Sequence, residues 1–274
     1  MLKIDAECHK LFFCHPNKDI ETYYPCYTQE INRFIRLAEP YVQVEILAMW
    51  DIWMRDFMPM PTDRGPLLFT YLPDYQTKCE SQKSREYVHK RYPQLKTNPI
   101  KLDGGHLVFN SKGIGFLTDY VIRLNQMPKD KLEQKIKQAT GLKKIIWLPW
   151  NKKDITGHTD GLLQFLTDDV LLINDDSDFE KHRQIIRKEC PNIEIIPIPC
   201  RYDPHKRKNF PSCCGIYTNF VQTPKAIFIP VYNMDLDEVV LKRFLSLTNK
   251  PIVPVRIEKT AINGGSLHCL TRNF

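Results

Sequence analysis

A helix followed by a strand-like run recurs along the chain at an interval of roughly fifty residues, and this recurrence limits the fold more than any other feature. Each helix is indicated by apolar residues at helical spacing and ends near Pro or Gly. In the last helix, for example, we place Val239, Val240 and Phe244 on the apolar side. The predicted helices span residues 28–39, 81–92, 128–141, 178–190 and 235–247.

Each predicted helix is followed by a run rich in β-branched residues, which indicates a strand. Residues 106–118 and 220–232 each contain a further pair of short strands joined at Asn, Gly or Pro. The repeating unit is therefore strand, strand, helix, strand, used five times, and we predict a single α+β domain over residues 1–274. The strands that follow the helices span residues 42–47, 98–102, 143–149, 193–199 and 251–257.

Composition excludes several classes of protein. A hydrophobic content of 42% fits a globular chain with a core, and no run approaches the ~18 apolar residues of a membrane span. The start of the chain has no apolar stretch typical of a signal peptide, so we expect a cytoplasmic protein. The nine cysteines are odd in number and irregularly spaced, which favours thiols over disulfides, and their clusters lack zinc-ligand spacing. The net charge is +7, and basic residues gather in two stretches, 143–153 and 201–209. Because both stretches are short and interrupted by apolar or acidic residues, we do not expect a nucleic-acid partner.

Unusual polar motifs follow the post-helix strand in every unit. Their key residues are separated by 47, 55, 61 and 50 positions. Five repeats around an axis would bring these strand ends together in one pocket, which is how active sites are commonly assembled. Such a pocket would explain a cysteine placed five residues before the last one. The residues are Asp56, Asp103, His158 with Asp160, Asn219 and Cys269.

The motifs WMRDFMP, DGGH, GHTDGLLQF and GGSLHCLT resemble the signature blocks of the agmatine deiminase and bacterial peptidylarginine deiminase family. The blocks occur in family order from about residue 40 to the end of the chain. The resemblance implies the pentein fold, a β/α-propeller of five ββαβ units around a pseudo-fivefold axis. It also implies hydrolysis of a guanidino group without metal or organic cofactor.

The resemblance assigns roles that suit guanidine chemistry. Asp56 and Asp160 would hold the planar cation through paired hydrogen bonds. Cys269 would attack its central carbon and form a covalent thiouronium intermediate, while His158 would transfer protons to ammonia and from water. Asp103 and Asn219 would lie near the substrate. The expected partner is an agmatine-like small guanidine or an arginine peptide, and a homodimer stays open.

Each assignment has a structural alternative. Asp160 could cap a helix, Asp56 could pair with a surface cation, and His158 could be a loop histidine bonded to backbone. Trp53 could belong to the core instead of the substrate wall. His268 also neighbours the nucleophile, but adjacent residues of a strand face opposite ways, so we prefer His158 as the proton carrier.

The chain departs from the family at several positions. Met58 stands where Gly is common, Gln164 replaces a common Arg, and the block usually containing Glu, Gly-Gly and Asn reads Asp103-Gly104-Gly105-His106. These changes bear on the substrate more than on the reaction. Two rival functions are an amidinotransferase of the same superfamily, in which an amine replaces water, and a non-catalytic protein that binds through its basic surface.

Overall fold

The computed structural model describes residues 1–204, 206–207 and 210–274, so part of the basic stretch predicted at 201–209 lies outside the described residues. The chain divides into two compact units built from non-contiguous segments. Unit 1 comprises Met1–Ile4, Arg55–Ile173 and Ser177–Ile196; unit 2 comprises Asp5–Met54, Asn174–Asp176 and Pro197–Phe274. The prediction of one domain stays a prediction. The helices of the described chain are each too short or too polar to cross a bilayer.

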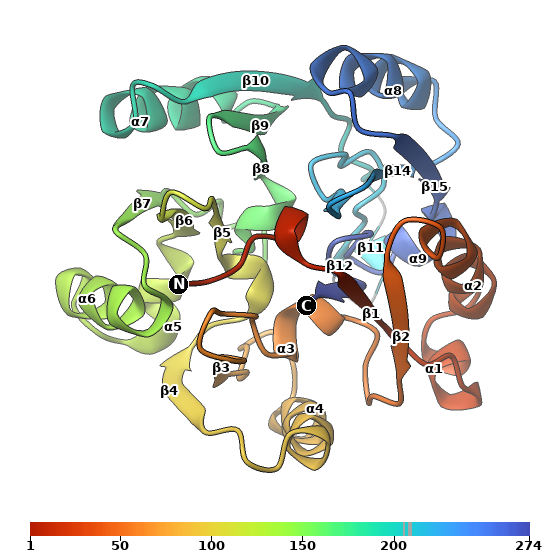
Figure 1. Ribbon diagram of the computed structural model, residues 1–274, viewed down its shortest axis with the longest axis horizontal. Helices are drawn as coiled ribbons and strands as arrows, with labels where there is room; N and C mark the ends of the chain where they lie inside the picture. Colours follow the sequence, from red (N-terminus) through yellow and green to blue (C-terminus); the bar gives the residue numbers. More distant parts are fainter. Residues whose placement is uncertain (205, 208–209) are drawn as a thin grey trace. The chain divides into compact units, whose positions relative to one another are not determined.

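Unit 1 contains the middle repeats of the sequence. In its central sheet β6 pairs antiparallel with β5 and parallel with β7, and α6 packs beside β7 (Figure 1). A second sheet has the order β10-β9-β8, and β3 pairs with β4. The elements are α3 (Met54–Phe57), β3 (Leu68–Thr70), α4 (Lys78–Arg91), β4 (Thr97–Lys101), the 3-10 helix η2 (Gly104–His106), β5 (Val108–Phe109), β6 (Ile114–Thr118), α5 (Tyr120–Asn125), α6 (Lys129–Thr140), β7 (Lys144–Leu148), the 3-10 helix η3 (Thr159–Gly161), β8 (Leu163–Thr167), β9 (Val170–Asp175), α7 (Phe179–Glu189) and β10 (Glu194–Pro199).

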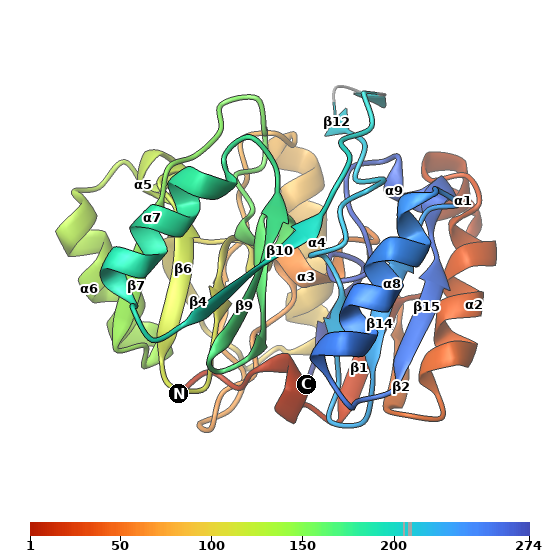
Figure 2. The same ribbon diagram turned by 90° about the horizontal axis from the view of Figure 1, so that it is seen from above.

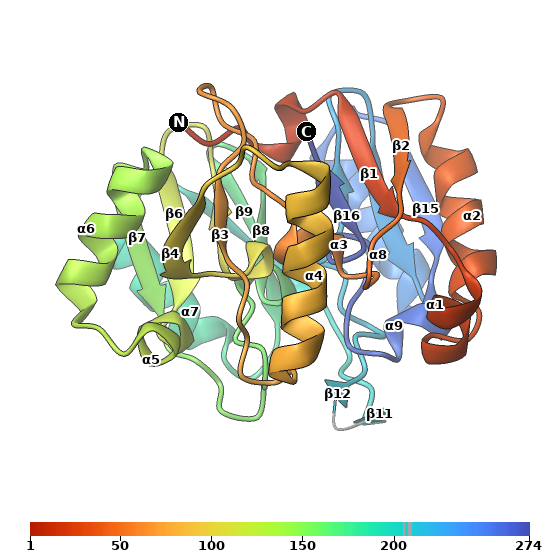
Figure 3. The same ribbon diagram turned by 90° about the horizontal axis from the view of Figure 1, so that it is seen from below.

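Unit 2 contains the first and last repeats. Strand β14 pairs antiparallel with β13 and parallel with β15, and α8 covers them (Figure 2). Strand β1 pairs parallel with β2 and antiparallel with β16, so a strand near the C-terminus completes the first repeat (Figure 3). The elements are the 3-10 helix η1 (Asp5–Glu7), β1 (Lys10–Cys14), α1 (Lys18–Tyr23), α2 (Tyr27–Ala38), β2 (Gln43–Leu47), β11 (Lys206–Arg207), β12 (Phe210–Pro211), β13 (Val221–Gln222), β14 (Ile227–Val231), α8 (Leu236–Leu247), β15 (Ile252–Arg256), α9 (Glu258–Ala261) and β16 (Thr271–Asn273).

The five predicted helices and the strands after them are confirmed within a few residues at each end. The predicted chain order of strand, strand, helix and strand is present in β5-β6-α6-β7 and in β13-β14-α8-β15. In the sheet β16-β1-β2 the antiparallel strand instead comes from the other end of the chain. The prediction that Val239 lies on the buried side of the last helix was wrong. Val239 is 52% exposed, whereas Val240 and Phe244 of α8 are buried.

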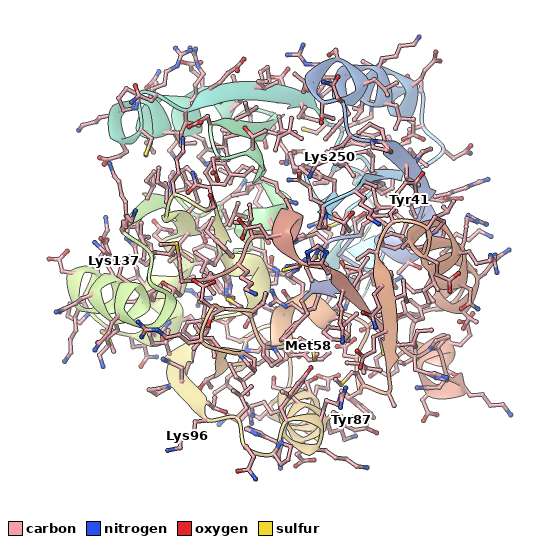
Figure 4. The ribbon with its side chains drawn as sticks, viewed as in Figure 1. Tyr41, Met58, Tyr87, Lys96, Lys137 and Lys250 are labelled. Atoms are coloured by element: carbon pink, nitrogen blue, oxygen red, sulfur yellow. The ribbon has the colours of Figure 1, made fainter. Side chains whose placement is uncertain are left out.

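Aromatic packing joins the two three-stranded sheets of unit 2. The Phe34 ring of α2 lies 5.1 Å from the Phe13 ring of β1 and 5.4 Å from the Phe228 ring of β14. Tyr41, labelled in Figure 4, adds an edge contact to Phe228 at 6.0 Å. Burial of such large rings stabilises the unit, since each removes much apolar surface from water.

Candidate functional site

Asp56 lies on α3 beside the Gly-Gly turn that follows β4. The Gly105 N–H donates to Asp56 Oδ1 over 3.1 Å. A Cβ at Gly105 would lie 2.7 Å from His158 Nδ1 and 2.9 Å from Asp56 Oδ1, distances that a methyl group cannot occupy. The glycine therefore permits backbone, carboxylate and imidazole to meet at one point.

His158 lies between two carboxylates. Its Nε2 is 3.2 Å from Asp103 Oδ2, and its Nδ1 is 3.7 Å from Asp56 Oδ1. Burial alone would lower the imidazole pKa, but the charges of Asp56 and Asp103 outweigh it and raise the pKa of His158 to about 10. The two carboxylates therefore favour the imidazolium form of His158 at neutral pH.

The loop before His158 is fixed by local geometry. Gly157 adopts φ +64°, and a Cβ there would collide with the Tyr120 ring at 2.4 Å, so only glycine fits this position. Thr156 closes the preceding turn by donating through its N–H and hydroxyl to Asp154 Oδ1 at 2.9 and 2.8 Å. These contacts place His158 directly before η3.

Asp160 in η3 is fully buried and belongs to the same group of charges. Burial raises the pKa of Asp56 to about 7, and Asp103 and Asp160 add to that rise while His158 opposes it. Asp160 likewise supports the raised pKa of His158. We call Asp56, Asp103, His158 and Asp160 the acid–histidine cluster; it concentrates negative charge around one imidazolium.

Two contributors to this cluster were missed by the sequence reasoning. The Tyr75 hydroxyl donates to Asp103 Oδ2 over 2.8 Å and lies 3.4 Å from His158 Nε2. Burial works to raise the pKa of Asp103, but its imidazole and tyrosine neighbours lower it below the ordinary value. No local pattern marks Tyr75, since it stands in the loop before α4. His106, the other contributor, was noticed as a departure from the family and given no role.

The ligand atoms of Asp103, His106 and His158 lie within 4.8 Å of one another, a spacing that could hold a metal ion. His106, however, accepts the Asp103 N–H at Nδ1 over 2.9 Å and contacts the Thr156 carbonyl oxygen through Nε2 over 2.9 Å. A metal ligand needs an available nitrogen lone pair. Because both ring nitrogens of His106 are engaged by backbone, the trio does not fit a metal site.

In unit 2, Cys269 lies in a turn over residues 267–270, which we call the cysteine turn. Asn219 Oδ1 accepts the His268 N–H over 3.1 Å and the Cys269 N–H over 3.3 Å. Cys269 is only 7% exposed, although it is near the end of the chain. The turn is thus tied to the polar residue of the preceding motif.

Trp53 supports the Gly-Gly pair that precedes the cysteine turn. A Cβ at Gly265 would lie 2.3 Å from the Trp53 ring, so the glycine backbone lies directly against the indole. Tyr24 meets the same indole edge-on, with ring centroids 5.7 Å apart. Trp53 is therefore half-buried structure beside the turn, and its predicted contact with substrate stays a prediction.

His268 corrects one step of the sequence reasoning. The argument from strand alternation does not apply, because residues 267–270 form a turn and β16 begins at Thr271. His268 Nε2 nevertheless has its own partner, Asp5 Oδ2, at 3.0 Å. This contact engages the ring at η1, and His158 stays the preferred proton carrier.

The other departures from the family are buried. Met58 (Figure 4) is 3% exposed after α3, and Gln164 is 5% exposed in β8. Of the predicted site residues, unit 1 brings together Asp56, Asp103, His158 and Asp160, and unit 2 brings together Trp53, Asn219 and Cys269. A single pocket that contains all of them stays a prediction.

The chain is similar to proteins of one known family. The family described as Porphyromonas-type peptidyl-arginine deiminase matches residues 14–274. A Vibrio parahaemolyticus protein provisionally named an agmatine deiminase is 22% identical over 210 residues, which cover 64% of this chain and 58% of that protein. The chain thus spans less than two thirds of that relative, although it covers 80% of a 22% identical, similarly named protein from Enterococcus faecalis.

Solved structures show the same fold. The agmatine deiminase of C. jejuni superposes with a TM-score of 0.81 at 21% identity, covering 98% of this chain and 93% of that one. DDAH from Pseudomonas aeruginosa superposes with a TM-score of 0.62 at 13% identity, covering 98% and 100%. The mixed α/β fold is therefore that of agmatine deiminases and DDAH, and with the match over residues 14–274 the chain belongs to the Porphyromonas-type peptidyl-arginine deiminase family.

Proposed function

We propose that the protein is a cysteine-dependent guanidine deiminase that releases ammonia and a ureido product. The observation that carries the proposal is the position of the His158 imidazole between the carboxylates of Asp56 and Asp103, whose charges, with that of Asp160, raise its pKa. Such a cluster suits a cationic substrate whose leaving amine must be protonated as it departs. Membership of a deiminase family supports the same reaction.

Substrate binding is assigned to Asp56 and Asp160. A guanidinium is flat and presents paired N–H groups, which carboxylates recognise by bidentate hydrogen bonds. A unit charge ~4 Å from one carboxylate gains on the order of 4 kcal/mol at an effective dielectric of 20. Asp56, whose pKa is raised to about 7, would be fully ionised once the cation is bound.

The reaction then proceeds in two steps. The Cys269 thiolate attacks the central carbon, a C–S bond forms, and the C–N bond to the departing amine breaks as His158 donates its proton. Ammonia leaves a thiouronium on Cys269. Neutral His158 next takes a proton from water, which attacks the same carbon, and cleavage of the C–S bond returns the thiol and the ureido product. A raised pKa supports His158 as the donor of the first step.

The substrate class follows from relatives and not from the cluster itself. Agmatine is the substrate named for the C. jejuni and E. faecalis structures, and peptidyl-arginine is named in the family description. We favour an agmatine-like small guanidine, with an arginine peptide as the variant to be tested. We also propose that the repeats are arranged around a common axis, which would bring Cys269 to the acid–histidine cluster.

The test is ammonia release from agmatine, free arginine and an arginine peptide, each with and without an added amine acceptor. We expect acceptor-independent ammonia from at least one guanidine and loss of release in Cys269→Ala. Ammonia that appears only when an amine is added would indicate an amidinotransferase. Full ammonia release by a folded Cys269→Ala variant, or none from any guanidine with the unmodified protein, would overturn the proposal.

A further inference from the structure

His106 is fully buried, and no step of the proposed reaction uses it. It ends η2, and its ring bonds backbone on both sides: the Asp103 N–H donates to Nδ1, and Nε2 lies 2.9 Å from the Thr156 carbonyl oxygen. An amide N–H can only donate and a carbonyl can only accept. These two partners therefore fix the neutral tautomer that carries its hydrogen on Nε2.

The two bonds join separate loops of the acid–histidine cluster. One loop carries Asp103, and the other carries His158 two residues after Thr156. The His106 ring also meets the His158 ring edge-on, with centroids 4.6 Å apart and planes at 87°, and the Tyr120 ring lies 5.3 Å from its centroid. His106 thus contacts the two loops that carry Asp103 and His158, and it does so through hydrogen bonds to backbone groups.

Protonation of the His106 ring would destroy this arrangement. A proton on Nδ1 would face the Asp103 N–H and remove that hydrogen bond. Burial lowers the pKa of His106 to about 4, in keeping with a neutral ring between two backbone groups. The carboxylates beside the neighbouring His158 raise its pKa instead. The two adjacent histidines therefore favour opposite protonation states.

We propose that His106 is a positioning residue: as a neutral brace it fixes the distance between Asp103 and His158, and so sets the rate of proton transfer. This role rests on the proposed deiminase function. An asparagine here could accept the Asp103 N–H through its side-chain oxygen but carries no atom in the place of Nε2. The second ring nitrogen of the histidine is therefore what holds the loop before His158.

The test compares two amides that each replace one ring nitrogen. His106→Asn keeps an acceptor for the Asp103 N–H, whereas His106→Gln can place its amide N–H near the Thr156 oxygen. We expect His106→Asn to lower kcat by roughly 10- to 100-fold with KM within about threefold, because a misplaced proton donor affects the chemical step. His106→Gln should also lower kcat with KM little changed, because it too keeps only one of the two bonds that join the loops. Unchanged kcat in either folded variant, or a loss that falls on KM instead of kcat, would overturn the brace.

A measurement on the unmodified protein does not depend on activity. Nitrogen-15 NMR of the histidine rings should show His106 as the neutral Nε2–H tautomer throughout pH 6–9. Titration of His106 in that range, or an Nδ1–H tautomer, would disprove the proposal even if neither variant folds. Absence of deiminase activity would instead leave this result intact and count against the proposed function alone.

Discussion

The acid–histidine cluster and the cysteine turn hold their reactive groups by different means. In the cluster, side chains face side chains: His158 lies between Asp103 and Asp56, and Tyr75 donates to Asp103. In the cysteine turn, a single side chain, Asn219, accepts backbone N–H groups, and Cys269 is placed by its main chain. The cluster should therefore respond to changes in charge and pH, and the turn to changes in backbone hydrogen bonding.

Removing the imidazole should have the largest effect on the cluster. We expect His158→Ala to lower kcat by about 10²- to 10⁴-fold, since general acid–base groups contribute factors of that size. Steady-state ammonia release measures the change. His182→Ala is the matched control, because His182 is 4% exposed and His158 is 8% exposed in the same unit. Similar losses in the two variants would reduce His158 to a structural residue.

The pH profile of kcat/KM should show an acid limb near pH 7, because the pKa of Asp56 is raised to about 7 and its carboxylate must be ionised to attract the cation. Below that pH we expect a fall of about tenfold per pH unit, as for loss of one required ionisation. A profile that stays flat down to pH 5 would show that ionisation of Asp56 in the free enzyme is not required for substrate binding.

The alkaline limb should depend on Asp103. This carboxylate helps to raise the pKa of His158 to about 10, so Asp103→Asn should move the limb to lower pH by about one unit or more. Asp168→Asn serves as control, because Asp168 accepts from Ser111 and takes no part in the cluster. An unmoved limb in Asp103→Asn would show that another group carries the alkaline ionisation.

The smallest effect is expected for Asn219 in the cysteine turn. Asn219→Ala leaves the Cys269 N–H without its side-chain acceptor, whereas the His268 N–H keeps the Asn219 carbonyl oxygen at 3.2 Å; loss of such a buried bond costs about 1–3 kcal/mol. Activity and the unfolding midpoint should fall together, whereas both limbs of the pH profile should stay in place. Asn219→Asp keeps an acceptor oxygen and should restore stability. A shift of either limb in Asn219→Ala would break the contrast between the two regions.

Much of the repeat was predictable from sequence because its signals are local. Apolar residues at Ile31, Phe34 and Ile35 define α2, and Gly141 at φ +78° ends α6 as predicted. The start of α4 was placed three residues late. The capping box between Thr77 and Glu80 begins that helix, and this signal was not used.

Features that depend on distant contacts could not be predicted in this way. β16 pairs with β1 from the other end of the chain, and nothing within residues 271–273 names that partner. Tyr75 reaches Asp103 from a loop 28 positions away, so no spacing rule identifies it. The motif spacing did place Asp56, Asp103, His158 and Asp160 after the strands β2, β4 and β7, where the structure has them, and their roles in catalysis and binding stay predictions.

The most direct test of the account is intact-protein mass spectrometry of the enzyme quenched during turnover of agmatine or another accepted guanidine. We expect a transient mass gain equal to the substrate minus ammonia, mapped by digestion to the peptide that contains Cys269. Cys214→Ala, which removes a thiol of equal 7% exposure, should show the same adduct. Ammonia release at the full rate with an unmodified Cys269, or an adduct on a different residue, would contradict it.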